Sequence, residues 1–366
     1  MISINQPWIG EEEKLEVMKV LEENAFTSAS NDGGKRVQIL ESLLERFLNI
    51  ENVIVLNSGT AALYAALLCL GIGPGDEVLL PSFTFVATAN SVIASGAKPV
   101  FVDINRKDYT IDIKDLQEKI SKRSKAIIPV HLYGHPADME EISEVAATHS
   151  LEIIEDACQS LGSTYHNVQT GTIGKIGCFS FYASKVLTAG EGGAVSTKDK
   201  ELASLIKMIR NHGMIEGNDT RRLGLNLRLP ELCAAIASVQ MNRLPTLLGI
   251  RRKNSKILTE LLSSMEGKLN IPFEREKRKF NWYLYTVAFQ NESTRDRIQQ
   301  ALIDDGIAAT IYYAPPVHKT PYYSNAGLVN LPDTDWAASH VLSLPVHPRV
   351  AEEDLNHVVS CIRKKI

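Results

Sequence analysis

The chain has 366 residues, of which 44% are apolar and 22% are charged, and its formal net charge is −4. This balance is ordinary for a globular protein and argues against a surface for nucleic acid or an anionic membrane. No apolar run approaches the ~20 residues of a membrane-spanning helix, and we expect no secretory leader. The five cysteines form no CxxC pair, so we expect free thiols and a cytoplasmic location.

Seven short apolar segments predict buried strands, with helical patterns between several of them. The predicted strands are residues 53–56, 78–80, 99–102, 126–130, 152–154, 178–182 and 194–197. The predicted helices are two acidic N-terminal patterns and, among others, residues 61–70, 115–120 and 139–148. Because apolar runs without polar alternation are covered on both faces, these strands predict a mostly parallel seven-stranded sheet with crossover helices.

The pattern changes near residue 245. A long helical pattern leads into predicted strands at residues 282–289 and 308–312, and closing helices follow. We therefore predict an α/β chain with two parts: a large domain over residues 1–245, which includes the N-terminal helices, and a smaller C-terminal α/β domain over residues 246–366.

Polar and aromatic residues follow the predicted strands. The segments are NSGT at 57–60, PSFTF at 81–85, HLYGHP at 131–136, EDACQS at 155–160, and the region that holds Ser180 and Lys185. Ligands of an open parallel sheet bind beyond the carboxyl ends of its strands. The sequence therefore predicts one ligand site at that edge.

Four features of this edge together describe a site for pyridoxal phosphate. Gly59 and Thr60 open a helix whose free amides can bind a phosphate, although a plain capped helix is the favoured explanation of this feature taken alone. Asp156 can keep a heteroaromatic nitrogen protonated, or it can simply cap a helix. An aromatic residue is available for ring stacking, and Lys185, set between two strands, can lose its proton and attack an aldehyde.

Long, ordered motifs carry a resemblance to a known family. They include NSGTAALYAAL, GPGDEVLLPSFTFVATANSV, IIEDACQSLGS and GCFSFYASKVLTAGEGGAV. The chain resembles the DegT/DnrJ/EryC1/StrS sugar aminotransferases, which are pyridoxal-phosphate enzymes of the aspartate-aminotransferase fold (fold type I). The segment HLYGHPADM is similar to that of perosamine-synthase-like members.

The resemblance implies a role for each matching cofactor residue. Lys185 would form the Schiff base and carry the proton, and Asp156 would pair with the pyridine nitrogen. Gln159 would contact the phenolic oxygen of the ring, and Phe85 would stack on its face.

The phosphate of the cofactor has its own implied residues. Gly59, Thr60 and Ser180 would hold it within one chain. Asn226 or Arg228, in GLNLRLPELCAAI, matches a segment that completes this site from the partner subunit in relatives. The resemblance therefore implies a homodimer with shared active sites.

Four histidines are candidates for other contacts. His318, in PPVHKTPYY, matches a histidine near the sugar pocket, and His212, in RNHGM, is a second candidate for substrate contact. His131 and His135 have the i, i+4 spacing of a metal pair, but the Gly and Pro of HLYGHP argue against a helix. Packing is the favoured explanation, and we expect no metal site.

The resemblance implies amination of a nucleotide-linked keto sugar in amino-sugar or surface-glycan biosynthesis, with glutamate as the expected donor. A 4-keto-6-deoxy sugar is favoured, and a 3-keto sugar is the alternative. Two further hypotheses stay open: a non-catalytic sensor that binds the cofactor or a sugar nucleotide, and another fold type I reaction such as cysteine desulfuration.

Overall fold

Seven strands form the central sheet of the computed structural model, which describes residues 1–215, 217–324 and 329–366. In chain order they are β1 (Asn52–Leu56), β2 (Glu77–Pro81), β3 (Lys98–Val102), β4 (Ser124–Ile127), β5 (Glu152–Asp156), β8 (Ile176–Ser180) and β9 (Gly193–Thr197). Their order across the sheet is β1-β9-β8-β5-β4-β2-β3. Strand β9 runs antiparallel to both of its neighbours, β1 and β8, and all other neighbouring pairs are parallel. The predicted mostly parallel sheet is therefore confirmed.

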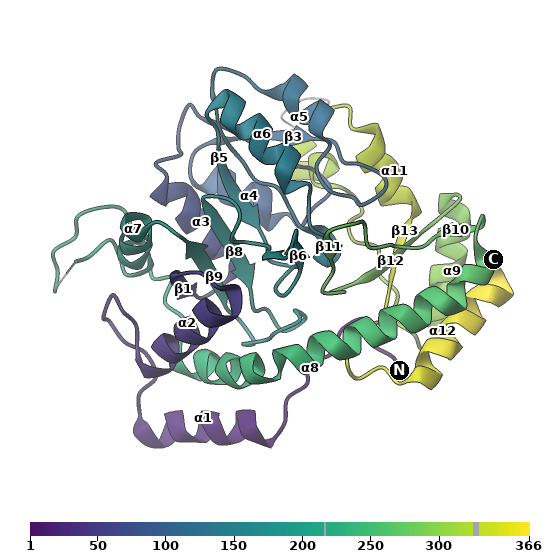
Figure 1. Cartoon of the computed structure of the whole chain (residues 1–366), viewed down its shortest axis with the longest axis horizontal. Coiled ribbons are helices and arrows are strands. Elements are labelled where there is room, and N and C mark those ends of the chain that lie inside the picture. The colour runs from purple at the N-terminus through teal and green to yellow at the C-terminus, as the bar shows by residue number, and fades with distance from the viewer. Residues whose placement is uncertain (216, 325–328) are drawn as a thin grey trace.

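Most helices from the same part of the chain cover the sheet (Figure 1). They are α2 (Lys35–Leu48), α3 (Gly59–Cys69), α4 (Ala87–Ala94), α5 (Ile113–Lys119), α6 (Met139–His149) and α7 (Lys200–Arg210), with a short 3-10 turn η1 (Leu132–Gly134). Helix α1 (Glu11–Glu23) lies farther from the sheet. Seven of the eleven residues of helix α3 are Ala or Leu, and the helix packs against β8, β9, α4 and α7. A helix that is apolar on every side is stable only when it is buried in this way.

The two faces of the sheet bury two separate apolar clusters. Along β1, Val53 and Val55 belong to one cluster, whereas Ile54 and Leu56 belong to the other. All four side chains are at most 2% exposed. Because successive side chains of a strand point to opposite faces, this alternation shows that the sheet is covered on both sides, as its continuous apolar runs predict.

A long helix connects the central sheet to the C-terminal region. Helix α8 (Glu231–Leu262) packs against α1 and α2 at one end and against α12 at the other, as Figure 1 shows. The C-terminal elements are β10 (Leu269–Asn270), β12 (Tyr285–Phe289), α9 (Glu292–Asp304), α11 (Pro332–His340), β13 (Val341–Leu344) and α12 (Glu352–Lys365). The predicted domain boundary after residue 245 falls inside α8 and stays a prediction.

Smaller elements complete the described chain. The strands β6 (Thr164–Tyr165), β7 (Val168–Gln169) and β11 (Arg278–Lys279) form a separate three-stranded sheet. The short helices are η2 (Ser263–Met265), η3 (Val317–Lys319) and α10 (Pro321–Ser324).

The predicted strand at residues 308–312 is wrong. Thr310 forms only one antiparallel bridge, to Ser343 of β13. The chain then reaches Pro315 and Pro316, which have no amide hydrogen with which to extend a ladder. The third strand of the C-terminal sheet is instead β13, which pairs with β12.

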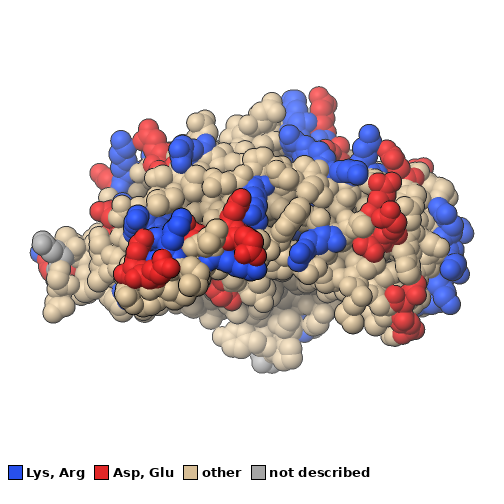
Figure 2. Space-filling view, turned by 90° about the horizontal axis from the view of Figure 1, so that it is seen from below, with Lys and Arg blue, Asp and Glu red and all other residues tan. Residues whose placement is uncertain are grey.

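The surface of the molecule mixes both signs of charge. On the face shown in Figure 2, basic and acidic side chains are interspersed. None of the described helices is long and apolar enough to cross a membrane. Within residues 1–215, 217–324 and 329–366, no group of three or more His, Cys, Asp or Glu side chains has the arrangement of a metal site.

Candidate active site

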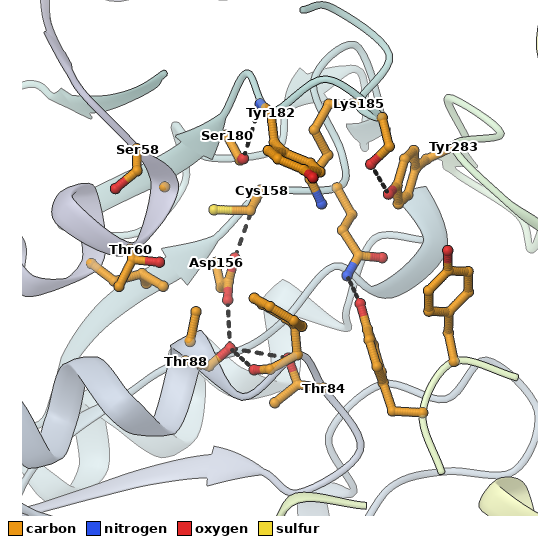
Figure 3. Close-up of a pocket in the computed structure, with 18 of the residues that line it drawn as sticks. Ser58, Thr60, Thr84, Thr88, Asp156, Cys158, Ser180, Tyr182, Lys185 and Tyr283 are labelled. Carbon is orange, nitrogen blue, oxygen red and sulfur yellow. Dashed lines mark hydrogen bonds between the residues drawn. The ribbon is translucent and has the colours of Figure 1, made fainter. Parts of the chain in front are cut away.

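A cavity of about 480 Å³ opens at the sheet edge where β5 and β8 end and α3 begins (Figure 3). Seven of the residues that the sequence predicts at a cofactor site line it: Gly59, Thr60, Phe85, Asp156, Gln159, Ser180 and Lys185. They come from segments that are up to 126 residues apart in the sequence, between Gly59 and Lys185 (185 minus 59). The parallel strands bring these segments together because their carboxyl ends share one edge.

Asp156 lies at the end of β5, and its carboxylate is held by neutral donors. The Thr88 hydroxyl donates to Oδ2 at 2.8 Å, and the backbone amide of Cys158 donates to Oδ1 at 3.2 Å. The residue is only 5% exposed, and it forms no ion pair with the part of the chain that the structure describes. A buried carboxylate with neutral donors alone is a favourable place for a cationic ligand atom such as a protonated ring nitrogen.

The first turn of α3 is held tightly against the sheet. The Ser58 hydroxyl caps the helix by accepting a hydrogen bond from the Ala61 amide at 3.1 Å, and the Ser58 carbonyl accepts from Ala62. A Cβ atom at Gly59 would lie 2.8 Å from both Cys158 Sγ and Ser180 Cβ, so only glycine fits. The cap and the first carbonyl leave the amides of Gly59 and Thr60 available at the positive end of the helix, beside the cavity.

Lys185 lies in the loop between β8 and β9 and contacts an aromatic ring from the C-terminal region. Its Nζ lies 4.6 Å from the ring centre of Tyr283. The Tyr283 hydroxyl is 3.3 Å from Ser184 Oγ, and Tyr283 is only 5% exposed. The Tyr283 ring, which is itself hydrogen-bonded to Ser184, therefore packs against the lysine amine at one wall of the cavity.

Gln159 and Phe85 form another part of the wall. Gln159 Oε1 accepts a hydrogen bond from the Tyr133 amide at 2.8 Å, and its Nε2 donates to the Tyr313 hydroxyl at 3.1 Å. Burial raises the pKa of Tyr313 well above its usual value, so this phenol stays protonated. Phe85 is 54% exposed, with its ring centre 6.0 Å from that of Tyr313. Its exposed face leaves room for a stacked ring.

The predicted partner-subunit residues lie outside this cavity. Asn226 is exposed, and its carbonyl accepts a hydrogen bond from Asn57 Nδ2 at 3.3 Å. Arg228 is partly buried, and its guanidinium donates to Asn211 Oδ1 at 2.7 Å. Their contact with a second subunit stays a prediction.

The predicted substrate histidines also lie outside the cavity. His212 is exposed and has a positive φ of 59°. His318 is 6% exposed, and its Nδ1 lies 2.8 Å from Ser82 Oγ. Burial is the main cause of the lowered pKa of His318. The assignment of both residues to the substrate stays a prediction.

Sequence reasoning missed several residues of the site. Tyr283, Tyr312 and Tyr313 line the cavity from the C-terminal region, 98 to 128 residues beyond Lys185, and no local pattern marks them. Thr88 was detectable in principle, because it lies in the first turn of α4 directly after the PSFTF segment. Cys158 also lines the cavity, where burial raises its thiol pKa well above the usual value.

Comparisons with known proteins agree with this geometry. A "Pleiotropic regulatory protein" of Geobacillus stearothermophilus is 39% identical over 96% of this chain and 95% of its own. A UDP-N-acetyl-3-dehydro-α-D-glucosamine 3-aminotransferase of Acidithiobacillus ferrooxidans is 36% identical over 95% and 92%. A GDP-perosamine synthase of Caulobacter vibrioides is 32% identical over 99% and 97%.

The fold matches a solved structure over its whole length. A Streptococcus pneumoniae protein assigned as a sugar aminotransferase, solved in its PLP form, is 26% identical, with a TM-score of 0.94 over 100% of this chain and 99% of that chain. The family model described as the DegT/DnrJ/EryC1/StrS aminotransferase family matches residues 7–363. These findings confirm the predicted fold class, enzyme class and cofactor. The chain belongs to the DegT/DnrJ/EryC1/StrS aminotransferase family.

Proposed function

We propose that this protein transfers an amino group, taken from glutamate, to the keto carbon of a nucleotide-linked sugar in amino-sugar biosynthesis. The observation that carries the proposal is the meeting of Asp156, Lys185 and the open start of α3 around one cavity. Relatives named for nucleotide-sugar amination support the substrate class.

The residues of the cavity fit pyridoxal phosphate. When bound, this cofactor supplies an electron sink for the substrate carbon that loses or gains a proton. Asp156 would hold the proton on the ring nitrogen, because Thr88 and the Cys158 amide fix the position of its carboxyl group by hydrogen bonds. The amides of Gly59 and Thr60 and the Ser180 hydroxyl would bind the phosphate.

Lys185 is the group that moves protons in this scheme. Its amine would take a proton from the substrate carbon and deliver it to C4′ of the cofactor. Tyr283 and Ser184 position this amine. Tyr312 and Tyr313 narrow the cavity and exclude water from the reacting atoms.

We propose the sugar C3 as the aminated carbon. The relative named for C3 amination is 36% identical, against 32% for the perosamine synthase that represents the 4-keto-6-deoxy alternative. In the sequence, the HLYGHP segment favours the 4-keto-6-deoxy alternative. In the structure, His131 of this segment is hydrogen-bonded to Glu155, and His135 stacks on Phe280. Packing therefore explains both histidines without a substrate.

A shared active site in a homodimer would complete the phosphate pocket. Leu223 and Leu225, which are 64% and 43% exposed, shortly precede Asn226 in the sequence. Exposed apolar side chains of this size favour burial against a partner.

All five cysteines are free thiols, which fits the proposed cytoplasmic location.

The decisive experiment is a half-reaction. Protein loaded with pyridoxamine phosphate is mixed with UDP- or dTDP-linked 3-keto sugars, or with 4-keto-6-deoxy sugars, and return of the aldehyde form is followed by absorbance. We expect the 3-keto sugars to react faster. Faster reaction of the 4-keto sugars would overturn the choice of carbon.

The sensor hypothesis is the second candidate, because the 39% identical relative is named as a regulatory protein. It predicts that protein loaded with pyridoxal phosphate does not convert glutamate to 2-oxoglutarate in a single turnover. The enzyme hypothesis predicts conversion, and Lys185→Ala serves as the inactive control.

A further inference from the structure

Asn281 is a buried asparagine that connects two segments of the active cavity wall. It is 1% exposed and lies shortly before β12. Its Oδ1 accepts a hydrogen bond from the Tyr283 amide at 2.8 Å. Its Nδ2 donates to the carbonyls of Gln159 at 2.9 Å and Leu161 at 3.1 Å. The side chain therefore uses its acceptor and both of its donors, and it joins the C-terminal region to the segment that follows β5.

The hydrogen bond between Asn281 and Tyr283 closes a sharp turn of the backbone. Trp282, which lies between them, has a φ of 55°, in the left-handed region that aromatic residues rarely adopt. An asparagine side chain that accepts from the amide two residues further on stabilises such a turn. Without this side-chain oxygen, the Tyr283 amide loses its acceptor, and the turn that sets the direction of the Tyr283 side chain is weakened.

A third segment, after β4, is fitted around Asn281. The Asn281 amide donates to Ser163 Oγ at 3.0 Å, and that hydroxyl donates to the Gly134 carbonyl at 2.8 Å. Gly134 has a φ of 92°, and a Cβ atom at this position would overlap Asn281 Oδ1. Only glycine therefore leaves room for the asparagine, whose side chain is held in one position by packing as well as by hydrogen bonds.

Asn281 reaches the active cavity only through its neighbours. Tyr283 lines that cavity, and Lys185 Nζ lies 4.6 Å from the centre of its ring (Figure 3). Gln159 lines the same cavity. Asn281 itself is not one of the described residues that line it. An effect of Asn281 on the reaction must therefore pass through the placement of these neighbours.

We propose that Asn281 is a positioning residue for transamination, which fixes the ring of Tyr283 beside the Lys185 amine. The inference rests on the proposed function, because the position of this amine matters only if Lys185 moves protons there. Reacting groups must be held closely, and a displacement of about 1 Å can slow a reaction by up to about a hundredfold.

Arg251 limits the damage that a substitution at Asn281 can do. It lies in α8 and is 3% exposed. Its guanidinium donates to the carbonyls of Trp282 at 3.2 Å and Tyr283 at 3.0 Å. The same segment is therefore held from its carbonyl side when Asn281 is replaced. We expect such a variant to fold and to react more slowly, without a complete loss of activity.

Three variants separate positioning from general damage. Asn281→Ala removes all three side-chain hydrogen bonds. Asn281→Ser keeps a hydroxyl that can accept from the Tyr283 amide, although more weakly than the asparagine does. Asn254→Ala is the matched control: this asparagine is 4% exposed and donates to three backbone carbonyls within residues 346–350 at 3.2 to 3.4 Å. Neither Asn254 nor that segment lines the active cavity.

The first measurement is the single-turnover reaction of the full-length, cofactor-loaded protein with glutamate, followed by absorbance at several glutamate concentrations. We expect Asn281→Ala to lower the limiting rate about tenfold, and to change the half-saturating glutamate concentration less than about threefold. Asn281→Ser should lower the limiting rate only about threefold. Asn254→Ala should keep the wild-type rate, although both alanine variants should lower the urea midpoint. A wild-type rate in Asn281→Ala, or equal slowing in Asn254→Ala, overturns the proposal.

A double variant tests the route of the effect. Tyr283→Leu keeps the backbone amide but removes the ring that Asn281 places. If Asn281 acts through this ring, adding Asn281→Ala to Tyr283→Leu slows the reaction little beyond the roughly tenfold effect of Tyr283→Leu alone, whereas independent effects multiply to roughly a hundredfold. A multiplied effect therefore also overturns the proposal.

Hydrogen exchange supplies a readout that needs neither cofactor nor turnover. In the cofactor-free protein, we expect the amides of residues 281–285 to exchange faster in Asn281→Ala and at the wild-type rate in Asn254→Ala. Unchanged exchange in Asn281→Ala overturns the proposal. Faster exchange in that variant, together with a wild-type protein that does not convert glutamate, refutes the proposed function and leaves Asn281 a purely structural residue. If the alanine variant does not fold, Asn281→Ser takes its place in every measurement.

Discussion

Replacing Gly59 with alanine tests the phosphate seat at the start of α3. The new Cβ would lie 2.8 Å from Cys158 Sγ and from Ser180 Cβ, about 1 Å inside the ordinary contact distance. Ser180 Cβ is attached directly to the backbone of β8 and cannot rotate away. The first turn of α3 must therefore move from the sheet, and its free amides move with it.

The structure sets the size of this effect. Overpacking of a tight site costs about 1–3 kcal/mol. We expect the free energy of unfolding of the cofactor-free protein to fall by this amount. If the displaced amides weaken phosphate binding by the same free energy of about 1–3 kcal/mol, the Kd for pyridoxal phosphate rises roughly 5- to 150-fold.

Two matched variants separate the contact from general damage. Adding Cys158→Ala to Gly59→Ala removes Sγ but leaves the contact with Ser180 Cβ, so we expect partial recovery. Gly249→Ala lies in α8 with no atom within 4 Å of the added Cβ, and alanine is the better helix former there. It should be neutral or slightly stabilising.

The assays are urea unfolding without cofactor and titration of the cofactor-free protein with pyridoxal phosphate, followed by absorbance. Wild-type stability together with a wild-type Kd in Gly59→Ala would refute the reasoning. The phosphate would then be bound elsewhere, and α3 would not press against β8 as it does in the structure.

Four further predictions test the site. Borohydride reduction should fix the cofactor onto Lys185, and peptide mapping of the adduct to another lysine would disprove that assignment. Asp156→Asn should fold and bind cofactor but lose nearly all transamination, because an amide does not stabilise a protonated pyridine; near wild-type turnover would make Asp156 only a structural residue. Tyr283→Leu should slow transamination about tenfold yet still allow the reduced adduct to form, and an unchanged rate would remove Tyr283 from the positioning of the amine. Inactive Lys185→Ala subunits mixed with inactive subunits that carry Asn226→Ala and Arg228→Ala should recover roughly a quarter of the wild-type sites, and no recovery after verified subunit exchange would exclude shared sites.

The sequence alone predicted the central sheet and the proposed cofactor residues at its edge. Each strand of that sheet is a short apolar run bounded by polar residues, so its position follows from local composition. Asp156 is the last residue of β5, and Gly59 and Lys185 follow the ends of β1 and β8 by three and five residues (59 minus 56 and 185 minus 180). Their meeting at one edge follows from the parallel arrangement, without knowledge of any side-chain contact.

Only the tertiary structure decided which distant residues complete the site. Tyr283 and Tyr313 reach the cavity because the C-terminal region packs beside the carboxyl edge of the sheet, and this packing has no signature in the local sequence. The same reason explains the mistaken strand at 308–312, since the pairing of β13 with β12 is a long-range choice. His318 matches a family motif, yet in this single chain its ring lies against Ser82 outside the cavity. Local patterns predict elements and the residues at their ends, whereas contacts between distant elements depend on packing that only the folded chain specifies.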